Sequence, residues 1–193
     1  MSKRLALFSA AAFGALTLTA AVVAPVSAQD KMKSEMSGEK TVMVGGAAMF
    51  PSKNIIQNAV NSKDHTTLVA AVKAAGLVGT LEGKGPFTVF APTNAAFGKL
   101  PAGTVDTLVK PENKPTLTKI LTYHVVPGRL EASSLTDGKK LKTVEGEELT
   151  VKKSGSTVTI VDAKGGASTV TIPNVNQSNG VIHVVDTVLM PAS

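Results

Sequence analysis

The spacing of hydrophobic and polar positions changes along this chain. Between residues 52 and 123, apolar residues recur three and four positions apart, which is typical of amphipathic helices. This spacing predicts helices at 53–60 after a Ser52 N-cap, from Asp64 to a stop at Gly76, at 77–81, from 95, at 105–109 and at 116–123. The first part of the domain is therefore expected to be mainly helical.

Beyond residue 128 the pattern alternates, or becomes rich in β-branched residues, with glycine-containing turns between the runs. Strands are predicted at 141–144, 148–152, 157–161, 169–172 and 181–190. Helices followed by a meander of strands indicate an α+β fold, in which helices group on one side of antiparallel sheets.

One strand is expected among the helices. Phe87 to Phe90 lies between a Gly-Pro turn and an Ala-Pro break, and its bulky residues on both faces favour a central strand. Pro92 should end the extended run because it has no N–H to donate to a ladder. Thr93 or Asn94 can then serve as the N-cap of a helix that begins at Ala95 and includes Phe97.

This strand–proline–cap–helix unit resembles the signature of the fasciclin domain. Two later segments support the resemblance in the same order, the Tyr123-His124 pair within 120–128 and the run from Asn179 to Leu189. The resemblance covers residues 52–191 and implies one compact β-sandwich or wedge with helices packed at one side. It also implies a mainly structural His124, beside a tyrosine that is credited with adhesion in animal members.

The first 28 residues match a secretory signal peptide. Lys3 and Arg4 form a positive head, an apolar run extends from Leu5 to Val23, and Val26-Ser27-Ala28 is a small-residue cleavage site. Cleavage after Ala28 would place the protein in the periplasm or the medium, without a membrane span in its mature form. Residues 29–51 are then expected to form a flexible leader, since Gln29 to Lys40 is polar and lacks periodicity. Within this leader, Thr41 to Met49 is interpreted as either a short edge strand or a connector.

Charge and cysteine content narrow the function classes. The formal net charge is +6, and removal of the first 28 residues lowers it by two. The remaining excess is small and scattered, which argues against nucleic acid as a partner. The absence of cysteine excludes thiol catalysis and thiolate metal sites. Lys139, Lys140, Lys142, Lys152 and Lys153 form one basic cluster, interpreted as a solvated strand edge, with anionic polysaccharide binding as the alternative.

The three histidines do not have the spacing of a metal site. His65, His124 and His183 lie far apart in sequence, and the one nearby carboxylate, Asp186, should point to the opposite face of the His183 strand. His65 follows a predicted helix cap and is expected to be exposed. We therefore expect neither a metal nor another cofactor.

His124 has two interpretations. As an acid–base group it would need a nucleophile such as Thr93 or Ser178, but the chain has no Gly-x-Ser-x-Gly elbow. As a core residue it would tie the end of its helix to the strand–helix unit at 87–97. The second interpretation is favoured, and the protein is not expected to be an enzyme.

Two further positions bear on function. Asp186 is one acid in an apolar strand, and if buried it needs hydroxyl or backbone donors such as Thr93. In animal fasciclin domains an Asp-Ile pair precedes the Asn-Gly-Val turn, and the matching positions here are Asn174 and Val175. A carboxylate-dependent integrin contact is therefore not carried over.

These observations predict a secreted or periplasmic monomer that acts in cell adhesion or in surface and matrix interaction, with a surface protein or polysaccharide as partner. The candidate adhesion or structural pair is Tyr123 and His124, and the structural residues are Phe87, Phe90, Thr93, Asn94, Phe97 and Asp186. The alternative is a periplasmic small-ligand or stress-related carrier, which a deep apolar pocket would favour.

Overall fold

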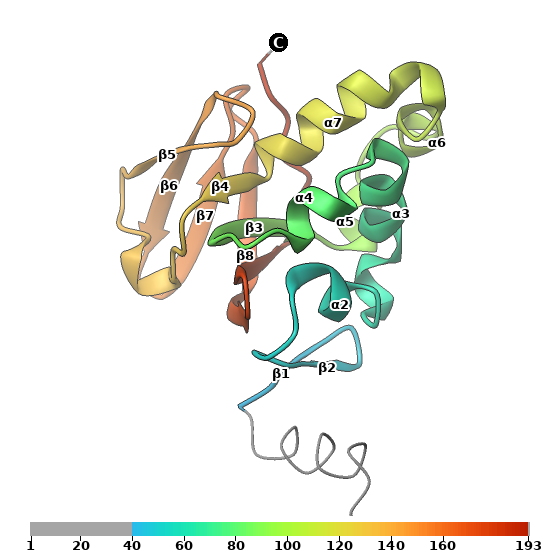
Figure 1. Cartoon of the computed structure of the whole chain (residues 1–193). Helices are drawn as coiled ribbons and strands as arrows, with labels where there is room; N and C mark the ends of the chain where they lie inside the picture. Colours follow the sequence, from blue (N-terminus) through green and yellow to red (C-terminus); the bar gives the residue numbers. More distant parts are fainter. Residues whose placement is uncertain (1–39, 193) are drawn as a thin grey trace, which may run out of the picture.

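The computed structural model describes residues 40–192, which form a sheet with a layer of helices beside it (Figure 1). Seven strands lie in the order β4-β3-β9-β8-β7-β6-β5. Their bounds are β3 Phe87–Pro92, β4 Val125–Pro127, β5 Lys140–Lys142, β6 Glu148–Ser154, β7 Thr157–Val161, β8 Ala167–Gln177 and β9 Gly180–Val185. The two end strands of the sheet approach each other: just beyond β5, the Val144 N–H donates to the Val125 carbonyl of β4 at 2.8 Å. The α+β wedge expected from the sequence is confirmed.

The strand β3 lies inside the sheet, between β4 and β9. It pairs in parallel with β9, with Phe90 opposite His183, whereas the sequence pattern had suggested only antiparallel pairing. The two strands approach closely at their starts, where a Cβ on Gly180 would lie 2.1 Å from the Phe87 carbonyl oxygen. Pro92 is the last residue of β3, so the strand runs to the proline before it ends.

The helical layer covers the side of β3 and β9 to which Val89 and Val184 point. Its members are α2 Ile55–Ala59, α3 Thr66–Ala75, α4 Val78–Glu82, α5 Asn94–Gly98, α6 Thr104–Leu108 and α7 Lys114–Tyr123, with single 3-10 turns at Lys63–His65, Pro111–Asn113 and Ala132–Ser134. Figure 1 shows these helices on the side of the molecule away from β5, β6 and β7. The helix α3 ends as expected at Gly76, which has a left-handed backbone conformation.

The start of α2 differs from the prediction. The helix begins at Ile55 with Asn54 as its N-cap, not after Ser52. The Asn54 side chain accepts from the Gln57 N–H at 2.8 Å, and the Gln57 side chain accepts from the Asn54 N–H at 3.0 Å. This capping box satisfies two backbone donors at once, which a cap at Ser52 would not do.

Part of the predicted flexible leader is folded. Strands β1 Val42–Val44 and β2 Ala47–Met49 form a hairpin, and the side chains of Val44 and Met49 are buried. Their burial against α2 explains why the leader cannot extend to residue 51. Residues 29–39 and the predicted signal peptide lie outside the described residues.

Two hydrophobic cores lie on opposite faces of β3 and β9. The sheet core consists of Phe90, Tyr123, Val126, Leu135, Leu141, Leu149, Val151, Val158, Ile160, Val185 and Leu189. The helical core consists of Val44, Met49, Ile55, Ile56, Leu68, Ala71, Val72, Ala75, Leu81, Val89, Ala91, Ala96, Phe97, Leu117, Ile120, Leu121, Val125, Val175, Ile182, Val184 and Val188. Alternation along β3 sends Phe90 to the first and Val89 and Ala91 to the second, which is the period of two expected for a strand.

Candidate functional site

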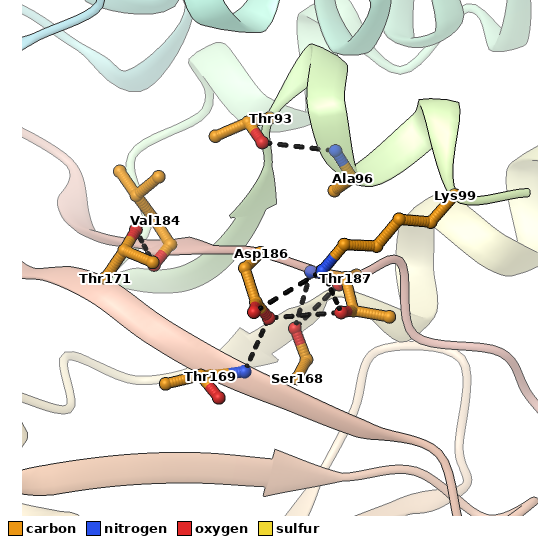
Figure 2. Close-up of polar contacts among 9 residues, drawn as sticks. All are labelled: Thr93, Ala96, Lys99, Ser168, Thr169, Thr171, Val184, Asp186 and Thr187. Atoms are coloured by element: carbon orange, nitrogen blue, oxygen red, sulfur yellow. Dashed lines mark hydrogen bonds and ion pairs between the residues drawn. The ribbon is translucent and has the colours of Figure 1, made fainter.

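The strand–helix unit at 87–97 is held by two polar caps. The Thr93 hydroxyl accepts from the Ala96 N–H at 3.2 Å and is the N-cap of α5, as the sequence predicts (Figure 2). Asn94 acts elsewhere: its side-chain oxygen accepts from the Thr67 N–H at 3.0 Å, and its amide donates to the Lys63 carbonyl. Asn94 therefore caps the start of α3, a helix nearly thirty residues earlier in the chain, while Phe97 is buried in the helical core.

His124 lies at the end of α7, fully enclosed. Its Nδ1–H donates to the Ile120 carbonyl at 2.8 Å, and its Nε2 accepts from the Leu189 N–H at 2.9 Å. The His124 carbonyl in turn accepts from the Phe90 N–H at 2.9 Å. Burial lowers the pKa of His124 to about 4, although the Ile120 carbonyl opposes this shift. A neutral ring with both nitrogens bonded internally joins α7, β3 and the C-terminal segment, and it has no nitrogen left for proton transfer.

Tyr123 is equally buried, and its hydroxyl reaches a different pair of loops. It accepts from the Ala163 N–H at 2.9 Å and donates to the Glu148 carbonyl at 3.3 Å. Burial raises the pKa of Tyr123, while the hydrogen bond from Ala163 opposes the shift. The ring is wholly inside the protein, so Tyr123 cannot contact a partner unless the fold opens.

Asp162 completes this junction. Its carboxylate accepts from the N–H groups of Lys164 at 3.0 Å and Gly166 at 2.7 Å, which closes the turn between β7 and β8. The second carboxylate oxygen accepts from the Met190 N–H at 3.0 Å. Leu189 and Met190 are thus bound by side-chain acceptors of His124 and Asp162, which anchors the last part of the chain. The sequence reasoning missed Asp162, whose only signal was an acid just before a Gly-Gly turn.

His183 and Asn174 form a second buried polar cluster. The His183 ring stacks on Phe90 with a centroid distance of 5.6 Å. Its Nε2–H donates to the Leu130 carbonyl at 2.7 Å, and its Nδ1 accepts from the Asn174 N–H at 3.3 Å. Asn174 adopts a left-handed backbone (φ 57°), and its side chain accepts from the Ala132 N–H at 2.7 Å. The position that matches the animal Asp-Ile pair is therefore used here to fix an internal loop.

His65 is buried, contrary to the exposure expected from its place after a helix cap. Only 3% of its surface is exposed, because the β1–β2 hairpin, α3 and β3 enclose it. Its Nδ1 is bonded to the Ser62 hydroxyl at 2.9 Å, but Nε2 has no hydrogen-bond partner among the described residues. Burial lowers the pKa of His65, with the nearby Ala91 carbonyl and Asp64 opposing the shift.

Asp186 lies directly after β9, in a small half-buried cluster (Figure 2). It accepts from the Thr169 N–H at 2.8 Å and from the Thr187 hydroxyl at 3.1 Å, and it lies 3.5 Å from the Lys99 ammonium. Thr93, which was considered as a donor, bonds to α5 instead. Partial burial favours a higher pKa for Asp186, but these donors together hold it below its ordinary value. The cluster connects α5 to the β8–β9 pair.

Three further polar residues pin the N-terminal segment to the domain. Asn179 accepts from the Ile55 N–H at 3.1 Å and donates to the carbonyls of Leu81 and Gly83. Asn58 donates to Gln177 and exchanges two hydrogen bonds with Phe50. In the sequence Asn179 stands out only as part of a turn, since its partners lie about a hundred residues away.

His124, Thr93 and Ser178 do not form a catalytic set. His124 is committed on both nitrogens, Thr93 caps a helix, and Ser178 lies on the surface, where its N–H donates to the Lys53 carbonyl. Within residues 40–192 no three His, Cys, Asp or Glu side chains gather where they could hold a metal ion. Across the same residues, no helix is both long and apolar enough to cross a membrane.

The fold and these motifs agree with three comparisons. The fasciclin domain model matches residues 63–191. Protein sll1483 of Synechocystis is 49% identical over 79% of this chain and 82% of its own length. Cell surface glycolipoprotein MPB83 of Mycobacterium bovis is 39% identical over 77% of this chain and 64% of its own length. A FAS1 domain pair from the insect cell adhesion molecule Fasciclin I shares the fold, with a TM-score of 0.65 at 17% identity, over 79% of this chain and 58% of that one.

These similarities define a class: a compact α+β domain with the fold of FAS1 domains. The chain belongs to the fasciclin domain family.

Proposed function

We propose that this protein is a non-enzymatic interaction module of the cell envelope, exported through its N-terminal segment and binding a surface protein or polysaccharide. The proposal rests on the side chains of the motif residues, which point into the domain. Tyr123, His124 and His183 all bond inside the domain, and family relatives include a cell-surface glycolipoprotein. The exposed loops and sheet face are then the surface left for a partner.

The outer face of β5 and β6 carries several exposed charged side chains. Lys140 and Lys142 are exposed on β5, and Lys152 on the same face of β6. Lys140 lies 3.3 Å from Glu148, which partly offsets its charge. A positive face of this kind favours an anionic partner, such as an acidic polysaccharide, at low ionic strength.

Binding and export can be tested together. Intact mass of the secreted protein should show a chain that starts at Gln29, and full-length protein in carbonate-washed membranes would contradict export. The immobilised protein should then retain an acidic polysaccharide such as alginate in preference to neutral dextran. Lys142→Glu with Lys152→Glu should reduce retention, while Lys110→Glu, on the exposed α6–α7 connection, should not. Equal retention by both variants would contradict this partner class.

The proposal that the protein is not an enzyme is tested by a separate activity assay. Wild-type protein should show no turnover of aryl esters, phosphate esters or glycosides above blank. A catalytic activity that is lost in a folded, equally stable His124→Ala variant would overturn the proposal.

A second function, carriage of a small ligand, is favoured by one observation, an apolar cavity in the helical core.

A further inference from the structure

The sheet splits between β7 and β8, and a hollow lies at the split. The two strands pair only from Thr159 opposite Thr169 to Val161 opposite Ala167. Beyond that point Thr157 of β7 pairs with β6, whereas β8 pairs with β9. The diverging strands leave an open hollow of about 260 Å³. This volume is close to the lower end of the range for small-ligand sites, so the hollow suits a ligand smaller than a typical drug molecule.

This β7–β8 hollow has a hydroxyl rim and an apolar floor. The rim carries four hydroxyl side chains, those of Ser156, Thr157, Thr169 and Thr171. Val158 and Val170, which pack into the sheet core, form part of the floor. Among the described residues, none that lines the hollow is charged. A sugar ring matches such a surface, because it presents hydroxyl groups at its edge and C–H groups on its faces.

The rim hydroxyls are available to a ligand. The Thr171 hydroxyl donates to the Val184 carbonyl at 3.2 Å and keeps its capacity to accept (Figure 2). Within residues 40–192, the hydroxyls of Ser156, Thr157 and Thr169 have no protein partner. Each of these three can donate one hydrogen bond and accept others, which is the combination that sugar hydroxyl groups require.

A positive charge lies on the same face as the rim. Cross-strand pairing places Lys152 of β6 beside Thr159 of β7, and Thr159 beside Thr169 of β8. Residues paired in this way share a face of the sheet. Neighbouring strands lie about 4.8 Å apart, so the backbone of Lys152 is about 10 Å from that of Thr169. An acid group that reaches exposed Lys152 therefore belongs to a ring beside the one in the hollow.

We propose that the β7–β8 hollow binds one uncharged ring of a linear acidic polysaccharide, while Lys152 binds the acid group of an adjacent ring. This inference rests on the proposed polysaccharide partner and specifies its chemistry, because a chain in which neutral and acidic rings alternate fits both features. An added peptide strand is a poorer fit, since Pro173 at the β8 edge of the hollow has no N–H to donate.

Two matched tetrasaccharides test the proposal. One alternates glucuronate with glucose, and the other is cellotetraose, in which every ring is glucose. Each is titrated into the purified protein while the backbone amide signals of Val158, Val170 and Thr171 are followed by NMR. Saturable shifts at these amides are expected with both probes. The acidic probe should bind about threefold more tightly at low salt, and this preference should vanish in about 1 M salt.

Four variants separate the ring contact from the charge contact. Thr157→Val keeps the shape of the side chain and loses its hydroxyl, so both probes should bind about three- to tenfold more weakly. Thr150→Val makes the same change on the same face outside the hollow, and it should bind like the wild type. Lys152→Gln should lose the preference for the acidic probe and keep the shifts at the hollow. Ala132→Leu adds bulk to the wall and should weaken both probes at least tenfold.

Circular dichroism checks the fold of each variant, and Thr157→Val decides the matter if Ala132→Leu does not fold. The inference is overturned by shifts confined to other parts of the domain, by wild-type affinity in folded Thr157→Val or Ala132→Leu, or by an acidic preference that survives in Lys152→Gln. Shifts at the hollow with the peptide Thr-Val-Thr-Val-Thr, but with neither sugar, would assign the hollow to a peptide strand and overturn it equally.

Failure of this inference is distinguishable from failure of the proposed function. If the wild type retains alginate but the hollow amides respond to neither tetrasaccharide, only the sugar site in the hollow is wrong. If it retains no polysaccharide and binds neither tetrasaccharide, the proposed partner class is wrong as well.

Discussion

The two hydrophobic cores use similar residues but differ in how completely they are filled. In the sheet core, the large side chains of Phe90, Tyr123 and Leu149 have no exposed surface, and the Tyr123 hydroxyl has hydrogen-bond partners. The helical core is built more from alanine and valine, and it keeps both a cavity and the unsatisfied Nε2 of His65. The sheet core is thus tightly packed and its buried tyrosine hydroxyl is hydrogen-bonded, whereas the helical core contains unfilled volume.

The family motif acts where the two cores meet. Tyr123 and His124 lie at the junction of the two cores, since Tyr123 belongs to the sheet core and Ile120 and Leu121 of the same helix belong to the helical core. Their hydrogen bonds join loops that are distant in sequence. The motif therefore fixes how the helical layer sits on the sheet, and the following experiments test that division of roles.

The largest effect is expected when the sheet core loses its central ring. Phe90→Ala should lower the free energy of unfolding by about 3–5 kcal/mol, because Phe90 is fully enclosed and also stacks on His183. Phe87, only partly buried, is the control, and Phe87→Ala should cost less. Equal losses in urea denaturation would break the distinction between the two faces of β3.

The junction should be nearly as sensitive. His124→Ala removes the partners of the Ile120 carbonyl and the Leu189 N–H and leaves a void, so we expect a loss of about 2–4 kcal/mol. Tyr123→Phe keeps the ring and loses only the hydroxyl, so it should cost about 1–2 kcal/mol. Denaturation showing the reverse order would contradict the role assigned to His124.

Low pH is expected to destabilise the fold by protonating His124. The pKa of His124 is about 4 when folded, against 6.5 as the ordinary value, so the unfolded chain binds the proton more readily between these values. The stability that the neutral His124 ring contributes is fully present above pH 6.5. It is lost as the pH falls toward 4, which lowers the free energy of unfolding by up to about 3 kcal/mol. Burial shifts the pKa of His65 and His183 in the same direction. Unfolding measured from pH 7.5 to 4 should show a shallower dependence in His124→Gln, and an unchanged slope would exclude His124 as a main cause.

Adding one methylene group tests the filling of the cores directly. Val151 has no exposed surface in the sheet core, so Val151→Ile should cost about 1–2 kcal/mol by overpacking. Val72 lines the cavity, so Val72→Ile should be neutral or slightly stabilising. Thermal unfolding of the pair measures the difference, and equal destabilisation would mean that the helical core has no usable space.

The smallest effect is expected outside both cores. Asp186→Asn keeps an acceptor for the Thr169 N–H and loses only the exposed ion pair with Lys99, whose side chain is half exposed. The cost should stay below about 1 kcal/mol and shrink further in 1 M salt. A larger loss that persists in salt would show that the Figure 2 cluster is more than a surface contact.

Local signals in the sequence were sufficient for much of this structure. The strand at Phe87, the Thr93 cap and the Gly76 stop depend on residues within a few positions, and these features are present as predicted. The parallel pairing of β3 with β9 could not be predicted from local sequence patterns, because it joins segments at opposite ends of the domain. His65 was misjudged for the same reason: the hairpin and strand that bury it are distant in sequence.

The candidate site shows the same limit. The sequence suggested that His124 ties its helix to β3, but not which atoms it bonds, since Leu189 lies 65 residues further on. Asn94 was one of two candidate caps for its own helix, yet its side chain caps α3. Polar residues of this kind have two or more plausible partners in a sequence, and only the packed fold selects one.

The place of β9 has a consequence for how the protein is made. This strand follows the other strands of the domain in sequence, yet it lies inside the sheet between β3 and β8 and contributes to both cores. Neither core can close until the C-terminal segment has emerged, and pairings between distant segments slow folding further. During synthesis the domain therefore stays open until β9 has left the ribosome.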